Sequence, residues 1–159
     1  IFAVVDSDHN KIYVANSDSN TASVIDGNND TEIRQINVGK SPEYMVLLTS
    51  KIYVVNLRSD TVSVINAANY KERNDIPLGN QTQASYGPMH IAVDDNVSPP
   101  RIYVVNSINN TVSVIDGYKH KESNNIVVGD GPTDIVYDNF DNKIYVVNSR
   151  DNTVSVING

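Results

Sequence analysis

The sequence predicts an all-β protein organised as a β-propeller, and three observations support this prediction. A pattern of four short strands recurs in four copies along the 159 residues, the last copy without its fourth strand. The apolar residues are mostly Val and Ile, whose branched side chains favour strands over helices. No stretch shows the apolar periodicity of 3.6 residues that an amphipathic helix requires. Four-stranded units that repeat every ~40 to 45 residues are typical of propeller blades.

The second strand of each repeat gives the strongest signal. It begins at a basic residue, continues with Ile-Tyr-Val and ends at Asn. A strand exposed on one face would alternate polar and apolar residues. This strand is apolar on both faces, as expected for a strand that is covered from two sides. Its copies span residues 11–16, 51–56, 101–106 and 143–148.

The third strand follows closely and has the sequence Thr-Val-Ser-Val-Ile, with Ala for the first Val in the first copy. Its copies span residues 21–25, 61–65, 111–115 and 153–157. An Asx-Gly pair, or Asn66-Ala67 in the second copy, comes next, and Asx-Gly suits positive φ. We therefore expect a tight turn with a left-handed glycine after each third strand. These pairs are Asp26-Gly27, Asp116-Gly117 and Asn158-Gly159.

The first and fourth strands are more variable and are located by landmarks. The first strand follows a proline and is predicted at 44–48, 90–93 and 134–137. The fourth precedes a glycine and is predicted at 32–38, 75–78 and 125–128. The landmarks are Pro42, Pro88 and Pro132, and Gly39, Gly79 and Gly129. The predicted blades are 1–40, 41–86, 87–130 and 131–159, and the last lacks its outer strand.

The strand pair Lys-Ile-Tyr-Val-Val-Asn-Ser and Asn-Thr-Val-Ser-Val-Ile-Asp-Gly resembles the YVTN family of β-propeller repeats. The family motif appears as Tyr-Val-Ala-Asn at residues 13–16 and as Tyr-Val-Val-Asn in the other three copies. The resemblance covers essentially the whole chain. It implies a propeller of roughly seven blades, of the kind found in archaeal surface-layer and secreted bacterial proteins that serve in adhesion, scaffolding or binding. The wider superfamily includes lactonases and propellers that bear haem or copper.

The repeats do not amount to a complete seven-bladed ring. We expect a partial arc of a larger propeller, with a small four-bladed ring or closure by a second copy as alternatives. An open arc exposes the apolar faces of its first and last blades. Such faces favour self-association, either face to face or through strand edges.

The composition excludes several function classes. The formal net charge is −7, which argues against nucleic-acid partners and anionic membranes, since both require clustered cations. No Cys is present, so no disulfide, thiolate metal site or Cys nucleophile can form. No apolar run approaches the ~18 residues of a membrane helix. We expect neither nucleic-acid binding nor membrane insertion.

Ligands of propellers usually bind around the axis, where the first strands begin. The residue two positions after each proline is a natural site there, and these residues are Tyr44, His90 and Asp134. They offer a phenol, an imidazole and a carboxylate, and Met89 beside His90 adds a soft ligand for copper or haem. The alternative is that each residue simply completes its strand.

The segment 80–87 is the longest connection that leads to a proline. It is uncharged and polar, and it ends near Tyr86, which suits contact with a glycan or a polar peptide. A tolerated surface insertion explains it equally well. Four Asn-x-Ser/Thr sequons lie in predicted loops and favour an exported, glycosylated protein. They begin at Asn29, Asn80, Asn96 and Asn109.

No motif of an enzyme is present: the chain has no Gly-x-Ser-x-Gly, phosphate loop or His-Glu-x-x-His. Its three His are scattered, so we predict no metal site and no cofactor. The first hypothesis is a non-enzymatic extracellular scaffold for cell-surface architecture, adhesion, or protein or glycan binding. An enzyme or redox propeller with an axial site near His90 is the second. The third is a subunit of a self-assembling surface layer or filament.

Overall fold

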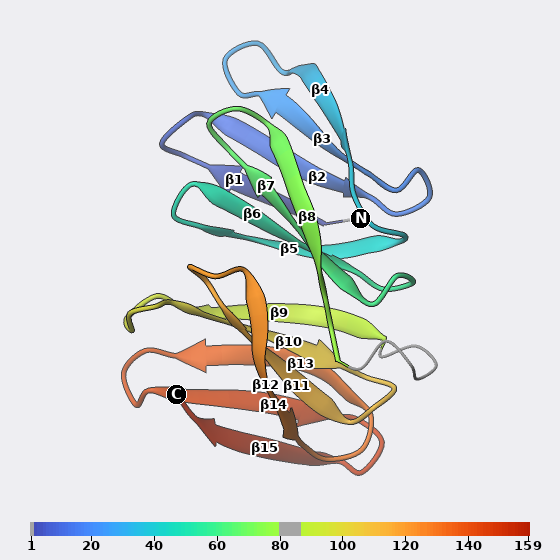
Figure 1. Cartoon of the computed structure of the whole chain (residues 1–159), viewed down its shortest axis with the longest axis vertical. Helices are drawn as coiled ribbons and strands as arrows, with labels where there is room; N and C mark the ends of the chain where they lie inside the picture. Colours follow the sequence, from blue (N-terminus) through green and yellow to red (C-terminus); the bar gives the residue numbers. More distant parts are fainter. Residues whose placement is uncertain (1, 80–86) are drawn as a thin grey trace. The chain divides into compact units, whose positions relative to one another are not determined.

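The computed structural model describes residues 2–79 and 87–159, without the side chains of 72–74. All regular structure in this part of the chain is β-strand (Figure 1). The strands form four antiparallel sheets, each from one predicted repeat and each with its strands in chain order. The predicted all-β class and strand order are therefore confirmed. No helix in the described residues is long and apolar enough to cross a bilayer.

The chain divides into two compact units, Ile1–Asp75 and Ile76–Gly159. The first unit holds one complete sheet and most of a second: β1 (Ala3–Asp6), β2 (Lys11–Asn16), β3 (Thr21–Asp26) and β4 (Thr31–Asn37), then β5 (Pro42–Leu48), β6 (Lys51–Asn56), β7 (Thr61–Asn66) and β8 (Lys71–Pro77). The second unit holds a four-stranded and a three-stranded sheet: β9 (Pro88–Asp94), β10 (Arg101–Asn106), β11 (Thr111–Asp116) and β12 (Lys121–Val127), then β13 (Pro132–Asp138), β14 (Lys143–Asn148) and β15 (Thr153–Asn158).

Each complete sheet presents two different apolar faces, because side chains alternate along a strand. We call one the tyrosine face: it carries Tyr13 and its equivalents, with the neighbours that pair beside them. The other is the isoleucine face, which carries Ile12 and its equivalents. In β1–β4 the tyrosine face is made by Tyr13, Ala15, Ala22 and Val24, and the isoleucine face by Val5, Ile12, Val14 and Ile25.

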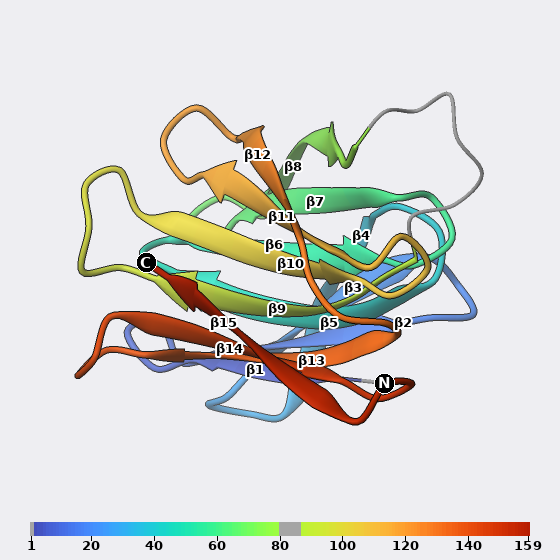
Figure 2. The ribbon, with the colours of Figure 1, turned by 90° about the horizontal axis from the view of Figure 1, so that it is seen from below.

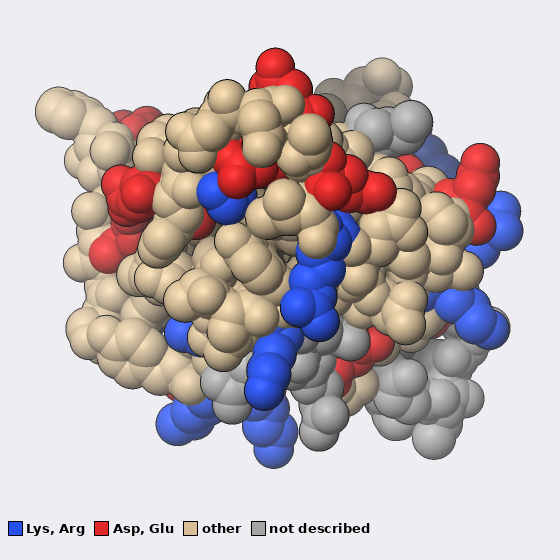
Figure 3. Space-filling view, turned by 90° about the horizontal axis from the view of Figure 1, so that it is seen from above, with Lys and Arg blue, Asp and Glu red and all other residues tan. Residues whose placement is uncertain are grey.

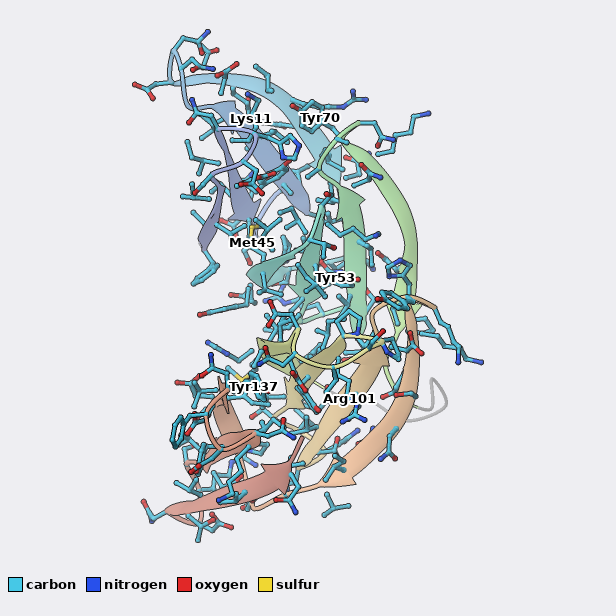
Figure 4. The ribbon with its side chains drawn as sticks, turned by 90° about the vertical axis from the view of Figure 1, so that its left-hand side faces the viewer. Lys11, Met45, Tyr53, Tyr70, Arg101 and Tyr137 are labelled. Carbon is cyan, nitrogen blue, oxygen red and sulfur yellow. The ribbon has the colours of Figure 1, made fainter. Side chains whose placement is uncertain are left out.

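In the first unit, the tyrosine face of β1–β4 packs on the isoleucine face of β5–β8. Tyr13 and Val24 are fully buried there against Met45, Ile52 and Val54. Figure 4 shows Met45 between the two sheets. The Tyr13 hydroxyl donates a hydrogen bond of 3.4 Å to the carbonyl of Ala67, and burial raises the pKa of this phenol well above its usual value.

The second unit repeats the same arrangement. The tyrosine face of β9–β12 supplies Tyr103, Val105 and Val112, which pack against Ile135 and Ile144 from the isoleucine face of β13–β15. Both faces of the second strand in a sheet are thus apolar because a sheet can be covered on each side. This is the arrangement that the Ile-Tyr-Val-Val sequence predicts.

The turn after each third strand differs from the prediction. Gly27 and Gly117 do not have positive φ; the left-handed residue is the last one before the fourth strand, for example Asp30 at 57°. The glycine instead lies close to the backbone of the loop that precedes the second strand. Its N–H donates to the carbonyl of Asn10 (3.0 Å) or Pro100 (2.8 Å), and a Cβ on Gly117 would lie 2.8 Å from that carbonyl oxygen.

Two strand boundaries also differ. First strands begin at the proline itself, two residues earlier than predicted. Fourth strands begin at Thr31, Lys71 and Lys121, also earlier than predicted. Strand β12 shows the reason for the second difference. It starts directly after the left-handed His120, and its first residues, Lys121–Asn125, are polar and mostly exposed, so they give no apolar pattern.

Candidate functional site

The Asn that ends each second strand has a structural role. Asn56, Asn106 and Asn148 are completely buried. In every repeat the side-chain N–H₂ donates to a Thr hydroxyl at 3.0–3.1 Å and to a Ser hydroxyl at 2.8–2.9 Å on the third strand. The repeated Asn, Thr and Ser therefore hold the second and third strands together at the end where a ligand site was expected.

Two of the landmark glycines, which follow the last strand of the preceding sheet, donate hydrogen bonds to this network. The N–H of Gly39 donates to the Ser63 hydroxyl, and that of Gly129 to Ser155, both at 3.1 Å. A Cβ on Gly39 would lie 2.6 Å from the side-chain nitrogen of Asn56, so only glycine fits. Gly79 departs from this pattern: its N–H donates to the Glu122 carboxylate at 2.7 Å.

The predicted axial residues occupy equivalent positions. Tyr44 pairs in register with Val55, His90 with Val105 and Asp134 with Val147, three matching positions of the second strand. The sequence analysis missed Phe2, which occupies the same position in the first sheet: its carbonyl accepts from the N–H of Ala15 at 2.8 Å. The landmark position, two residues before the axial residue, falls outside the 159 residues for Phe2, so it could not locate this residue.

These equivalent residues meet in pairs. In the first unit, the rings of Phe2 and Tyr44 stack with centroids 3.7 Å apart. In the second unit, His90 Nε2 lies 3.3 Å from Asp134 Oδ1. The His90 side chain is only 21% exposed, whereas that of Asp134 is 60% exposed. Burial lowers the pKa of His90 below its usual value of 6.5, and the Asp134 carboxylate opposes this shift. Near neutral pH, the pair is an imidazole beside a carboxylate.

The first unit also contains a pocket of about 340 Å³ at the end of the sheets where the first strands begin. We call this end of the unit the turn face. Three segments line the pocket: the β2–β3 turn, the β4–β5 connection with the start of β5, and the β6–β7 turn. The lining residues are Ser17, Asp18, Asn20, Lys40, Ser41, Glu43, Leu57 and Arg58.

Hydrogen bonds fix the frame of this pocket. Glu43 Oε1 accepts from the hydroxyls of Ser17 at 2.9 Å and Ser41 at 3.0 Å. The Ser41 N–H donates to Asn20 Oδ1 at 2.8 Å, and the N–H of Arg58 donates to the carbonyl of Lys40 at 3.1 Å. The backbone around the pocket is therefore pinned to the neighbouring turns.

The two cations of the pocket are available to a ligand. Lys40 and Arg58 are both exposed. Within the described part of the chain, no carboxylate lies within ion-pair distance of either side chain. Asp18 and the hydroxyl-bound Glu43 supply negative charge on the same lining. The pocket thus combines free cations with fixed hydrogen-bonding groups.

The second unit has the same frame with different side chains. The N–H of Gly131 donates to Asn110 Oδ1 at 2.9 Å, and that of Arg150 donates to the carbonyl of Asp130 at 3.2 Å. Asp130 stands where Lys40 stands in the first unit, and its carboxylate lies 3.8 Å from the Arg150 guanidinium. The guanidinium of Arg150 is therefore already paired with a carboxylate in the second unit.

The remaining predicted residues are dispersed. Tyr86 and Asn80 lie outside the described residues. Asn29 and Asn96 are exposed, but the side-chain nitrogen of Asn109, which would carry a glycan, is buried and has no hydrogen-bond partner among the described residues. Met89 is 38% exposed. Among the residues that the structure describes, no three His or carboxylate groups come close enough to hold a metal ion.

Comparison with known proteins identifies the fold. No protein-family model matches the chain, and no curated protein matches it. Solved structures do match: Kuenenia stuttgartiensis hydrazine synthase has a TM-score of 0.84 and 18% identity, over 98% of this chain and 45% of that one. Virginiamycin B lyase from Staphylococcus aureus has a TM-score of 0.73 and 13% identity, over 98% of this chain and 54% of that one. The WD40 β-propeller domain of Doa1 has a TM-score of 0.75 and 15% identity, over 96% of this chain and 48% of that one.

This likeness concerns the fold alone, since the identities are low. The chain spans about half the length of these structures. Together with the four antiparallel sheets, the likeness confirms the predicted architecture: the chain has the fold of part of a β-propeller.

Proposed function

We propose that this chain is a binding scaffold whose ligand site is the pocket on the turn face of the first unit. One observation supports the proposal most directly. The strands beneath the pocket are held by the Asn–Thr–Ser network that recurs in every repeat, whereas several residues that line the pocket differ between the two units. Lys40 and Glu43, for example, correspond to Asp130 and Thr133 in the second unit. A constant frame with variable lining is typical of binding loops on a rigid scaffold.

The chemistry of the lining favours an acidic glycan as the ligand. Lys40 and Arg58 suit a carboxylate group, because the Arg side chain can bind it through two parallel hydrogen bonds. The hydroxyl of Ser17, the amide of Asn20 and the carboxylate of Asp18 suit sugar hydroxyls. The volume of about 340 Å³ lies at the lower end of the range for small-molecule sites, which fits one or two sugar rings.

A location at the cell surface belongs to the same proposal. It rests on the resemblance to the YVTN repeats and on two exposed sequons, at Asn29 and Asn96. The acidic net charge of −7 agrees with a role away from nucleic acids. Figure 3 shows acidic and basic side chains interspersed on one face of the molecule.

Titration calorimetry with short oligosaccharides tests the site. Oligosaccharides with a uronic acid should bind, and their neutral counterparts should bind at least about tenfold more weakly, the loss expected for one charge-assisted contact. Arg58→Ala and Lys40→Ala should each weaken binding similarly, whereas the matched variant Arg150→Ala should not. The assignment would be refuted if acidic and neutral oligosaccharides bound with equal affinity. It would also be refuted if Arg58→Ala, Lys40→Ala and Arg150→Ala all bound the acidic oligosaccharide with equal affinity. Binding of acidic peptides alone would identify a protein ligand instead.

A second candidate function rests on the His90–Asp134 pair. A neutral imidazole that is 3.3 Å from a carboxylate can take up a proton during a reaction. A panel of aryl esters and lactones would test this activity. Turnover with an acidic limb below pH 6.5 that disappears in His90→Gln would support an enzyme, and unchanged turnover in that variant would exclude this pair as its catalyst.

A further inference from the structure

In the second, third and fourth repeats, the residue before the proline that opens the first strand has a left-handed backbone. Its φ is 54° at Ser41, 62° at Gly87 and 61° at Gly131. The three positions are equivalent, because the carbonyl of each accepts from the N–H of the residue that follows the second strand. Glycine adopts this conformation readily, whereas a residue with a Cβ is strained there. Ser41 therefore occupies a position that favours glycine.

This serine occurs together with a glutamate. Two positions further along the chain, the second repeat has Glu43, where the third has Met89 and the fourth has Thr133. The Ser41 hydroxyl donates to Glu43 Oε1 at 3.0 Å, and the Ser17 hydroxyl donates to the same oxygen at 2.9 Å. Ser17 follows β2 and Ser41 precedes the neighbouring strand β5 (Figure 2). The strained serine thus supplies one of the two hydrogen bonds that fix this carboxylate.

Only one oxygen of the Glu43 carboxylate is used within the described part of the protein. Over residues 2–79 and 87–159, no group donates to Glu43 Oε2, and no cation lies within ion-pair distance of either oxygen. Glu43 is only partly buried, and it lines the pocket on the turn face of the first unit. Its second oxygen is therefore a fixed acceptor that is available to a ligand.

The charges of the lining favour a ligand with charges of both signs. Lys40 and Arg58 are cations, and Asp18 and Glu43 are carboxylates. A ligand that carries only a carboxylate can pair with the cations, but it brings a second negative charge close to Glu43, which opposes binding. A ligand that also carries an ammonium group meets an opposite charge at both ends. Hydrogen bonds from a cation to a carboxylate are among the stronger ones in proteins.

We propose that the pocket binds a zwitterionic amino sugar. Its acid group pairs with Lys40 and Arg58, and its ammonium group donates to Glu43 Oε2. This inference rests on the proposed function and narrows the ligand from acidic glycans to those with a free amine on the acidic sugar. Ser41 is a positioning residue in this site, since it acts on the ligand through Glu43.

Titration calorimetry with two sugars that differ only at the amine tests the proposal on the full 159-residue chain. Muramic acid carries a carboxylate and a free amine, and N-acetylmuramic acid carries the same carboxylate with the amine acylated. Muramic acid should bind at least about tenfold more tightly, the gain expected for one charge-assisted contact. Glu43→Gln should bind both sugars alike. The matched variant Glu32→Gln, at an exposed carboxylate outside the lining, should keep the wild-type preference.

Ser41→Gly tests the positioning role in a chain that remains folded. The equivalent residues are glycines with nearly the same φ, so the variant should have the circular dichroism spectrum of the wild type. Its preference for muramic acid should fall about threefold, the loss expected for one hydrogen bond, because Ser17 alone then holds Glu43. An unchanged preference would overturn the role of Ser41.

The outcomes separate this inference from the proposed function. Equal binding of the two sugars by the wild type would overturn the inference and leave a site for acidic glycans. A preference that persists in Glu43→Gln would come from the bulk of the acetyl group and would overturn it too. If neither sugar binds, the inference fails. The proposed function fails with it only if oligosaccharides with a uronic acid do not bind either.

Discussion

Buried side chains on both faces of the second strand stabilise each repeat, and Val54 is the simplest example. It is fully buried in the core of the first unit. Val54→Ala should therefore lower the free energy of unfolding by about 2–4 kcal/mol, since it removes buried methyl groups and leaves a cavity. Urea denaturation at a constant m-value measures this loss. Val156→Ala is the matched control: its side chain is 55% exposed, so a loss within about 0.5 kcal/mol is expected for the monomer.

The Asn–Thr–Ser network also contributes to stability, and Asn56 allows this contribution to be measured. Its amide donates to Thr61 and Ser63 from a fully buried position. Asn56→Ala removes both hydrogen bonds inside the protein and should destabilise it by about 1–3 kcal/mol. Asn16 makes the same two bonds from a less buried position, where water can replace them. Asn16→Ala should therefore cost less in the same denaturation assay, and an equal cost would argue against burial as the cause.

His90 gives the stability a defined pH dependence. Because its pKa is lower in the folded chain than the usual 6.5, the unfolded chain takes up the proton first. Stability should be full above pH 6.5 and should decrease as the pH falls toward the folded pKa. His90→Gln should remove this slope. Asp134→Asn should lower the folded pKa further and so extend the slope to lower pH.

The carboxylates act in a separate, more acidic window. Hydrogen bonds from the backbone lower the pKa of Asp26 and Asp116, and the Thr153 hydroxyl lowers that of Asp151. Their contribution is present above the ordinary value near 3.8 and is lost as the pH falls below it. Thermal melts between neutral and acidic pH separate the two windows, and a slope near pH 6 that persists in His90→Gln would rule out His90 as its source.

At the scale of the elements, the connections between sheets depend on glycine for space. Gly39→Ala would place a methyl group 2.6 Å from the Asn56 amide and 2.5 Å from the Ser59 hydroxyl. This overlap should cost about 1–3 kcal/mol. In the double variant with Asn56→Ala, the added cost of Gly39→Ala should be smaller, since one of the two obstacles is gone, and a double-mutant cycle measures the difference.

Gly27→Ala is the control for this prediction. Its Cβ would meet the side chain of Asn10, which is exposed and can move aside, and would lie 3.1 Å from the Asn10 carbonyl oxygen. The equivalent turn of the second repeat already contains Ala67. We therefore expect little change in stability. A large loss would show that this turn is more rigid than the Ala67 turn.

The sequence predicted the elements unevenly, for physical reasons. The second and third strands were located because burial on both sides imposes an apolar sequence, as in Lys51–Asn56. The start of the fourth strand was missed because its polar residues face water. The left-handed turn residue was missed too, since a bulky residue such as Tyr70 has no preference for φ near 55°; the surrounding backbone imposes it.

The candidate site was predicted only in part. The prolines located Tyr44, His90 and Asp134, but which of them would meet depended on the packing of the sheets. The pocket on the turn face was missed because its lining comes from three separate segments without a shared motif. Lys40 and Arg58, for example, are close only because the β4–β5 connection is hydrogen-bonded to the β6–β7 turn.

At the scale of the whole molecule, the same tyrosine-to-isoleucine contact joins the two sheets of each unit, and this has an evolutionary consequence. The two contacts share one pattern, although the first repeat has Ala15 and Ala22 where the third has Val105 and Val112. Duplication or deletion of a whole repeat in the gene would therefore preserve the pattern of this contact. Such a chain can grow or shorten by one sheet at a time, while each turn remains free to acquire a new specificity.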